Sequence, residues 1–149
     1  MSDRDVKALT SEIECPTFES VAFNRLSKPL SECNVAIVTT ASLHHPDQPD
    51  FVGGDTSFRE LDGKRADWRL GHWSPNFDAS GFAIDPNVVF PIDRLRELAE
   101  RGVIGRVADR HLSYAGNQFD LSTIRLDSGP AGAVQLRNDG VDVVLLTPV

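Results

Sequence analysis

Residues 35–40 read Val-Ala-Ile-Val-Thr-Thr, and residues 141–147 read Val-Asp-Val-Val-Leu-Leu-Thr. Both runs are short, mostly apolar and rich in β-branched side chains, a composition typical of strands. The first run is continuous, so it fits a strand buried on both faces, as in a parallel sheet, better than one with a face in water. The two runs therefore predict two strands of an α/β fold.

A well-marked helix is predicted over residues 91–102. Pro91 suits the first helical position, and Gly102 suits the position that follows the last turn. Asp93 lies in the first turn, where a carboxylate complements the helix dipole. The apolar side of this helix would carry Ile92, Leu95, Leu98 and Ala99.

The remaining elements complete a pattern of alternating strands and helices. A short strand is expected within residues 103–114, and a modest helix is expected from Gly129 to about Asn138. The order strand, helix, strand, helix, strand favours an α/β fold with a parallel-type sheet and flanking helices. We expect an incomplete three-layer domain.

Proline, glycine and short polar residues interrupt the other parts of the chain. Residues 1–34 are predicted to be an irregular lead-in, residues 44–57 a long loop, and residues 58–90 mostly irregular. We therefore divide the chain into this N-terminal lead-in and one α/β domain over residues 35–149.

Composition excludes several classes of protein. The chain has 149 residues and a formal net charge of −7. Such an acidic chain does not suit a general binder of nucleic acids or anionic membranes, which uses clustered Lys and Arg. No apolar run approaches the roughly 18 residues that suggest a membrane span, and the charged N-terminus does not suit a secretory signal. We expect a soluble, cytoplasmic protein.

Ligands of open α/β sheets bind beyond the carboxyl ends of the strands. Two segments take that position here: the loop beyond Thr40 and the segment Thr147-Pro148-Val149. The loop carries adjacent histidines and nearby carboxylates, namely His44, His45, Asp47, Asp50 and Asp55. Adjacent histidines need not converge, and the spacing matches no recognised ligand pattern. We predict a solvated polar loop and no metal, with a metal-dependent enzyme built on His44, His45 and Asp55 as an alternative.

The interior of the chain offers no strong catalytic pattern. His72 and His111 could each act as a general acid or base, because an imidazole titrates near neutral pH, or could be structural histidines. Cys15 and Cys33 form no Cys-x-x-Cys pair, and Cys33 lies at the amino end of the first strand. Both cysteines are predicted to be incidental. The sequence also lacks phosphate-binding glycine loops and a serine-hydrolase elbow.

A series of segments from about Asn34 onward resembles the selenoprotein B family of glycine, sarcosine, betaine and D-proline reductases. The segments that carry the resemblance are Gly54 to Arg59 (GDTSFR), His72, Asp85 to Leu95 (DPNVVFPIDRL), Gly102 to Gly105 (GVIG), His111 to Gly116 (HLSYAG) and Gly140 to Val149 (GVDVVLLTPV). The block NVVFPIDRL, residues 87–95, is the most telling of them.

The resemblance implies a reductive cleavage of a C–N bond in an amino acid or its derivative. A selenocysteine, or a cysteine in some relatives, would displace the amine, and thiols with a thioredoxin-like electron donor would regenerate it. In the family that nucleophile follows directly after the strand corresponding to residues 141–147. The sequence printed here stops at Val149. We expect a product truncated before the nucleophile, for instance at a selenocysteine codon taken as a stop, with a shortened, non-catalytic relative as the alternative.

The resemblance also implies residue roles and partners. Asp55, Arg59, His72, Asp93, Arg94 and His111 fall on family-like motif positions. Asp55 and either Arg59 or Arg94 would bind the substrate, the guanidinium pairing with its carboxylate, although Asp93 and Arg94 could instead serve the helix start and a surface ion pair. His72 or His111 would protonate the departing amine. Expected partners are a small amino-acid-like substrate, other subunits of a reductase complex such as a pyruvoyl-bearing one, and the thioredoxin-like reductant. A non-catalytic binding or interaction module remains the competing function.

Overall fold

The structure is a computed structural model that describes residues 3–12, 17, 24–73 and 77–149. Its elements in chain order are α1 (Asp3–Ser11), η1 (Leu30–Glu32), β1 (Asn34–Thr39), β2 (Leu43–His44), β3 (Phe58–Asp62), β4 (Arg69–Leu70), α2 (Ser80–Ile84), η2 (Pro86–Val88), α3 (Ile92–Glu100), β5 (Arg106–Val107), β6 (Arg110–Tyr114), η3 (Ile124–Ser128), α4 (Gly129–Asn138) and β7 (Val143–Thr147). The α/β class with a mostly parallel sheet is confirmed.

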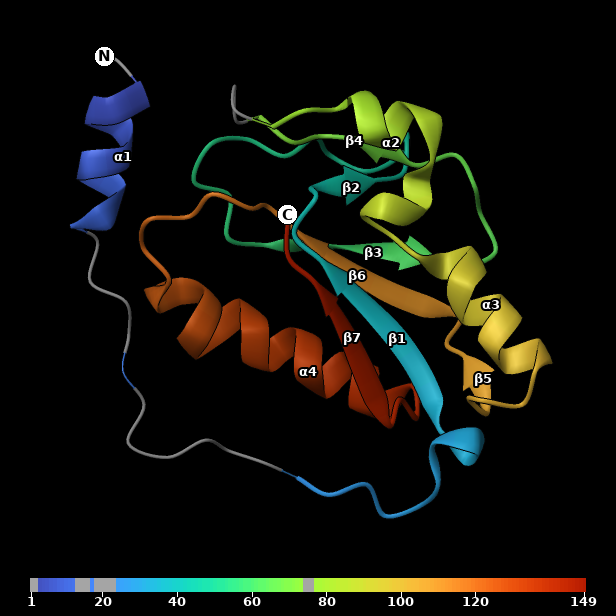
Figure 1. Ribbon diagram of the computed structural model, residues 1–149. Helices are drawn as coiled ribbons and strands as arrows, with labels where there is room; N and C mark the ends of the chain where they lie inside the picture. The colour runs from blue at the N-terminus through green and yellow to red at the C-terminus, as the bar shows by residue number, and fades with distance from the viewer. Residues whose placement is uncertain (1–2, 13–16, 18–23, 74–76) are drawn as a thin grey trace.

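Strand β1 lies at the centre of the main sheet (Figure 1). It pairs in parallel with β7 over most of its length, from Val35 opposite Val143 to Thr39 opposite Thr147. It also pairs in parallel with β5 at its start and with β6 at its end. Since a strand has only two edges, β5 and β6 share the second edge of β1. Strand β3 then pairs antiparallel with β6 and forms the outer edge.

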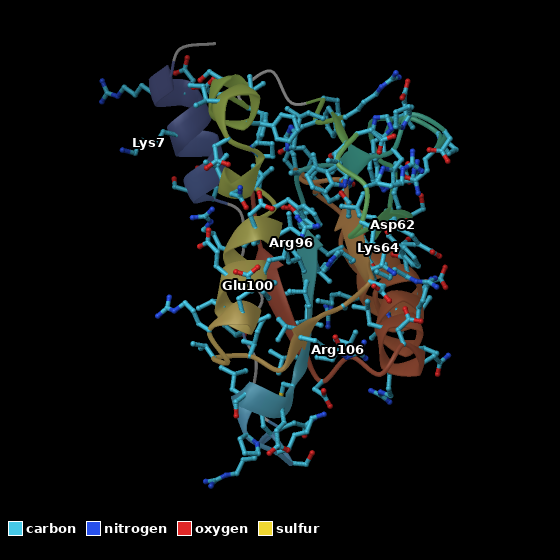
Figure 2. The ribbon with its side chains drawn as sticks, turned by 90° about the vertical axis from the view of Figure 1, so that its right-hand side faces the viewer. Lys7, Asp62, Lys64, Arg96, Glu100 and Arg106 are labelled. Carbon is cyan, nitrogen blue, oxygen red and sulfur yellow. The ribbon has the colours of Figure 1, made fainter. Side chains whose placement is uncertain are left out.

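Helices cover both faces of this sheet, so the domain has three layers (Figure 2). Side chains of β1 alternate between two apolar clusters, with Val35 and Ile37 on the α3 side and Ala36 and Val38 on the α4 side. This alternation confirms the prediction that the first strand is buried on both faces. Apolar burial of this kind contributes roughly 25 cal/mol per Å² and is the main source of stability of the sheet.

Helix α3 follows the sequence prediction closely. Ile92 and Leu95 are buried against β1, and Leu98 and Ala99 pack beside them. Gly102 ends the helix with a φ of +69°, a left-handed conformation that glycine adopts without a Cβ clash. Pro91 is the N-cap rather than the first helical residue, a shift of one position.

Two elements lie where the sequence shows no regular pattern. Helix α1 lies within the lead-in that was predicted to be irregular, and β3 lies within residues 58–90, which were predicted to be mostly irregular. Strand β3 has the sequence Phe-Arg-Glu-Leu-Asp, so its edge position leaves it largely polar and without an apolar pattern. Its five pairings with β6 decide its conformation. Among the residues that the structure describes, no helix is both long and apolar enough to cross a membrane.

Candidate functional site

The carboxyl ends of β1, β6 and β7 meet at one edge of the sheet. Thr39 of β1 lies opposite Ser113 of β6 on one side and opposite Thr147 of β7 on the other. The C-terminal residue, Val149, therefore lies beside the end of β1 (Figure 1). This is the edge at which open α/β sheets bind ligands, and it is one of the two segments that the sequence analysis selected.

The segment before α3 is held against this edge by two threonine hydroxyl groups. Thr39 Oγ1 and Thr147 Oγ1 both donate hydrogen bonds to the carbonyl oxygen of Val89, at 2.9 and 3.0 Å. Val89 and Phe90 are buried. The start of the block NVVFPIDRL thus packs on the ends of β1 and β7.

Gly116 lies where three segments converge at this edge. A Cβ atom on Gly116 would lie 2.9 Å from the carbonyl oxygen of Thr40, 3.1 Å from that of Val149 and 3.1 Å from Nε2 of His72. Real Cβ atoms rarely approach other atoms so closely. The absence of a side chain therefore allows His72 to approach the ends of both β1 and β7.

His72 is the predicted acid–base residue that lies at the site. Its imidazole stacks on the ring of Phe77, with 4.3 Å between centroids and 20° between planes. The side chain is half-buried, and burial lowers the pKa of the imidazole below its ordinary value. At neutral pH the ring is therefore mainly neutral and able to accept a proton.

A cavity of about 520 Å³ opens next to these residues. Among the described residues that line it, none carries a charged side chain, and most of the lining is apolar. The amides of Asn117 and Gln118 and the hydroxyl of Thr40 supply polar groups. The cavity is also lined by Val38, Tyr114, Leu121, Ile124 and Val149. Mostly apolar walls with a few polar groups are typical of small-molecule sites.

Asp55 and Arg59, the predicted substrate-binding pair, bind each other in the loop before β3. Arg59 NH2 lies 2.8 Å from Asp55 Oδ2, and its NH1 donates to Ser57 Oγ at 2.7 Å. The guanidinium also donates to the carbonyl oxygens of Pro49, Asp50 and Phe58. All five N–H donors of Arg59 are thereby engaged. Despite the opposing effect of burial, hydrogen bonds from Ser57 and Arg59 lower the pKa of Asp55.

Arg94 and Asp93 lie at the start of α3. Arg94 is exposed and pairs with Glu97 at 2.7 Å, while Asp93 pairs with Arg96 at 2.7 Å. Asp93 also accepts a hydrogen bond from the amide of Asn87. This geometry matches the alternative of a helix start with surface ion pairs. A substrate role for Asp55, Arg59 or Arg94 stays a prediction.

His111 lies in the interior of the sheet and is fully buried. Its Nδ1 accepts a hydrogen bond of 2.9 Å from the backbone N–H of Ile37, and its ring packs edge-on against Phe90. Burial, together with the nearby charge of Arg96, lowers the pKa of His111 to about 4. The imidazole therefore acts as part of the sheet, the structural alternative that the sequence analysis left open.

The histidines of the loop beyond Thr40 are buried rather than solvated. His45 Nε2 accepts from the N–H of Asp62, so its Nδ1–H donates to Asp67 at 2.9 Å. His44 Nδ1 contacts the carbonyl oxygen of His45. In the described parts of the chain, no three His, Cys, Asp or Glu side chains are placed to hold a metal ion. The structure therefore does not bring His44, His45 and Asp55 together as ligands of one metal ion, as the alternative of a metal enzyme requires.

Cys33 lies at the amino end of β1, as the sequence predicts, and cannot reach this edge of the sheet. It is buried, forms no disulfide, and its thiol lies 3.3 Å from the carbonyl oxygen of Pro29. Cys15 lies outside the described residues. Sequence reasoning missed Thr40 and Gly116 as site residues, although their positions just after strand-like runs could have indicated both.

Comparisons with known proteins agree with one another. The family model described as glycine/sarcosine/betaine reductase selenoprotein B matches residues 4–149. D-proline reductase subunit gamma of Acetoanaerobium sticklandii is 36% identical over 99% of the chain. Sarcosine reductase complex component B subunit beta of Peptoclostridium acidaminophilum is 30% identical over 92% of the chain. Glycine reductase complex component B subunit gamma of Carboxydothermus hydrogenoformans is 27% identical over 93% of the chain.

The chain spans only part of these relatives. It covers 62% of the D-proline reductase subunit and 33% of each of the sarcosine and glycine reductase subunits. No solved structure matches the chain significantly.

Proposed function

Because the chain belongs to the glycine/sarcosine/betaine reductase selenoprotein B family, we propose that it is part of a reductase subunit. The subunit cleaves a C–N bond in an amino acid or its derivative, with a selenolate or thiolate nucleophile that directly follows Val149. The observation that carries this proposal is the convergence of His72, Thr40 and Val149 on Gly116, beside an apolar cavity.

The first step forms a bond between the chalcogen and carbon. The deprotonated nucleophile attacks the carbon that bears the amine, the new bond forms as the C–N bond breaks, and the amine leaves with a proton. His72 suits both halves of this transfer. As a neutral base its imidazole accepts the proton of the selenol or thiol, and as an acid it returns that proton to the departing amine.

The second step regenerates the nucleophile. Two thiol groups supply two electrons and two protons, so that the chalcogen–carbon bond becomes a C–H bond while the thiols become a disulfide. The net change replaces a C–N bond by C–H and N–H bonds at the expense of one dithiol. A thioredoxin-like protein would be the natural source of this dithiol, and the whole reaction would take place in the cytoplasm.

The cavity beside Val149 is the proposed place of the substrate. It is large enough for a small amino acid, and its lining includes the amides of Asn117 and Gln118. Other subunits of a reductase complex would activate the substrate. Their presence is supported by the names of the relatives, two of which are components of reductase complexes.

The first test is to read the gene beyond codon 149. A UGA codon followed by an open reading frame supports the proposed nucleophile. An ordinary stop codon with no coding frame downstream favours instead the non-catalytic binding or interaction module.

The second test measures the activity of the full-length protein. It is assayed with its partner subunits, a dithiol, and D-proline, sarcosine, betaine and glycine in turn. We expect His72→Gln to lower turnover of the accepted substrate by about 10²–10⁴-fold with folding intact, because a proton carrier contributes that much. Gln48→Ala, in the loop between β2 and β3 and outside the lining of the cavity, is the control. Unchanged turnover in His72→Gln would remove His72 from the mechanism.

A further inference from the structure

The end of β7 is held to β1 by an irregular pair of hydrogen bonds. The regular parallel ladder reaches the N–H of Thr40, which donates to the carbonyl oxygen of Thr147 at 3.2 Å. Its next bond would run from the N–H of Val149 to the carbonyl oxygen of Thr40. Instead, the N–H of Val149 donates to the side-chain hydroxyl of Thr40 at 2.8 Å.

The same hydroxyl also binds the other polar group of Val149. Thr40 Oγ1 lies 3.3 Å from the carbonyl oxygen of Val149, to which it donates. One hydroxyl thus accepts from the N–H and donates to the C=O of a single residue, as a hydroxyl is able to do. The carbonyl oxygen of Thr40 lies close to Gly116, on which a Cβ atom would be 2.9 Å from this oxygen and 3.1 Å from Nε2 of His72.

We propose that Thr40 is a positioning residue for the nucleophile of the reductase. Its hydroxyl extends the pairing of β1 with β7 past Thr147 and fixes the backbone of Val149, so that the next residue projects beside His72 and the cavity. This inference rests on the proposed function, because it gives Thr40 a role only if the nucleophile follows Val149.

The geometry explains why a threonine suits this position. A backbone carbonyl can only accept, and it would hold Val149 at a single point, whereas the hydroxyl holds both of its polar groups. A displacement of about 1 Å in a reacting group can cost roughly a hundredfold in rate. The nucleophile is next to Val149 in sequence, so a loose Val149 would transmit its movement directly.

The first measurement uses the 149-residue protein and follows hydrogen exchange at the Val149 amide by NMR. We expect Thr40→Val, which keeps the shape and removes the hydroxyl, to speed this exchange at least tenfold. Thr40→Ser keeps the hydroxyl and should exchange like the parent protein. Thr17→Val, at an exposed position in the lead-in, is the matched control. Equal exchange in Thr40→Val and the parent protein would overturn the proposed contact.

The second measurement uses the full-length protein in its reductase complex. We expect Thr40→Val to lower kcat by about a hundredfold with KM unchanged, Thr40→Ser to restore it, and the pH dependence of iodoacetamide alkylation of the nucleophile to stay the same. If the parent protein is active and the Thr40→Val variant has the same kcat, the role of Thr40 is overturned while the proposed function stands. A parent protein inactive on all four substrates overturns the proposed function and this role with it.

Discussion

Gly116 shows how a single residue can decide the geometry of a site. The three groups that a Cβ atom on Gly116 would meet come from the segments after β1, β7 and β4, which are far apart in sequence. Two of them are backbone carbonyls, which cannot move aside as the end of a flexible side chain can. The close approach of His72 to the ends of two strands therefore depends on the missing side chain.

This dependence predicts the effect of adding one methyl group. Gly116→Ala should lower the free energy of unfolding by about 1–3 kcal/mol, the usual cost of overpacking, and should displace His72. Gly53→Ala is the matched control, because a Cβ atom on Gly53 would meet nothing within 4 Å. Urea unfolding of the two variants measures the difference. Equal stability of both would show that the edge of the sheet rearranges freely.

At the scale of elements, β5 and β6 behave as one strand with an irregular middle. Val35 of β1 lies opposite Val107, but Val38 lies opposite Leu112, so the second strand has extra residues between these pairs. Such a bulge leaves backbone groups of the partner strand without their regular ladder bonds. Here the imidazole of His111 accepts the N–H of Ile37 and closes the gap.

Because the imidazole of His111 at this bulge can titrate, the free energy of unfolding depends on pH. His111 has a pKa of about 4 in the fold and an ordinary value near 6.5 when unfolded. The unfolded chain therefore binds more protons than the folded chain between these pH values. The contribution of His111 to the stability of the fold is complete above pH 6.5 and is lost as the pH falls toward 4. We expect unfolding at pH 5 to be easier than at pH 7.5 by about 2 kcal/mol from this group alone.

Urea titrations at the two pH values test this prediction. His111→Asn offers an acceptor that does not titrate in this range, so the variant should lose about 2 kcal/mol of the pH dependence. The aspartates with lowered pKa values, such as Asp85 and Asp109, stay ionised at pH 5 and do not interfere. The same pH dependence in parent and variant would place the titrating group elsewhere.

At the scale of the whole molecule, β7 forms an open edge of the sheet. It pairs with β1 on one side, and no other strand of the described chain pairs with it. Leu146 is 68% exposed, and Val144 and Leu145 are each 38% exposed. An apolar strand with one free edge is able to pair with another chain. The strand next to the candidate site is thus also an unpaired edge that exposes apolar side chains.

We therefore predict that the 149-residue protein associates through β7. Leu146→Lys should reduce this association, because charged lysine side chains protect natural sheet edges. Ile84→Lys is the control, since Ile84 of α2 is 86% exposed but lies outside the sheet. Sedimentation velocity at several concentrations compares the two variants. An equal reduction in both would assign the association to general surface hydrophobicity rather than to the edge of β7.

The sequence predicts the parts of the fold whose signal is local. Strands β1 and β7 and helices α3 and α4 follow from apolar runs and helix-end residues, and the structure has them within a few residues of the predicted bounds. The edge strand β3 escaped prediction because its pairing with β6, rather than its own composition, makes it a strand. The sequence also predicts that ligands bind beyond the carboxyl ends of the strands, a prediction that depends only on topology.

The sequence by itself determined the class of fold and, through an ordered series of motifs, the family, and it predicts the edge of the sheet at which ligands would bind. Only the tertiary structure decided which residues meet there. It separated two histidines that look alike in sequence, placing His72 at the site and His111 within the sheet. It also brought Thr40 and Val149, which are far apart in sequence, within hydrogen-bond distance of each other. The physical reason is that such contacts depend on strand register and close backbone approach between distant segments, which no local pattern of residues encodes.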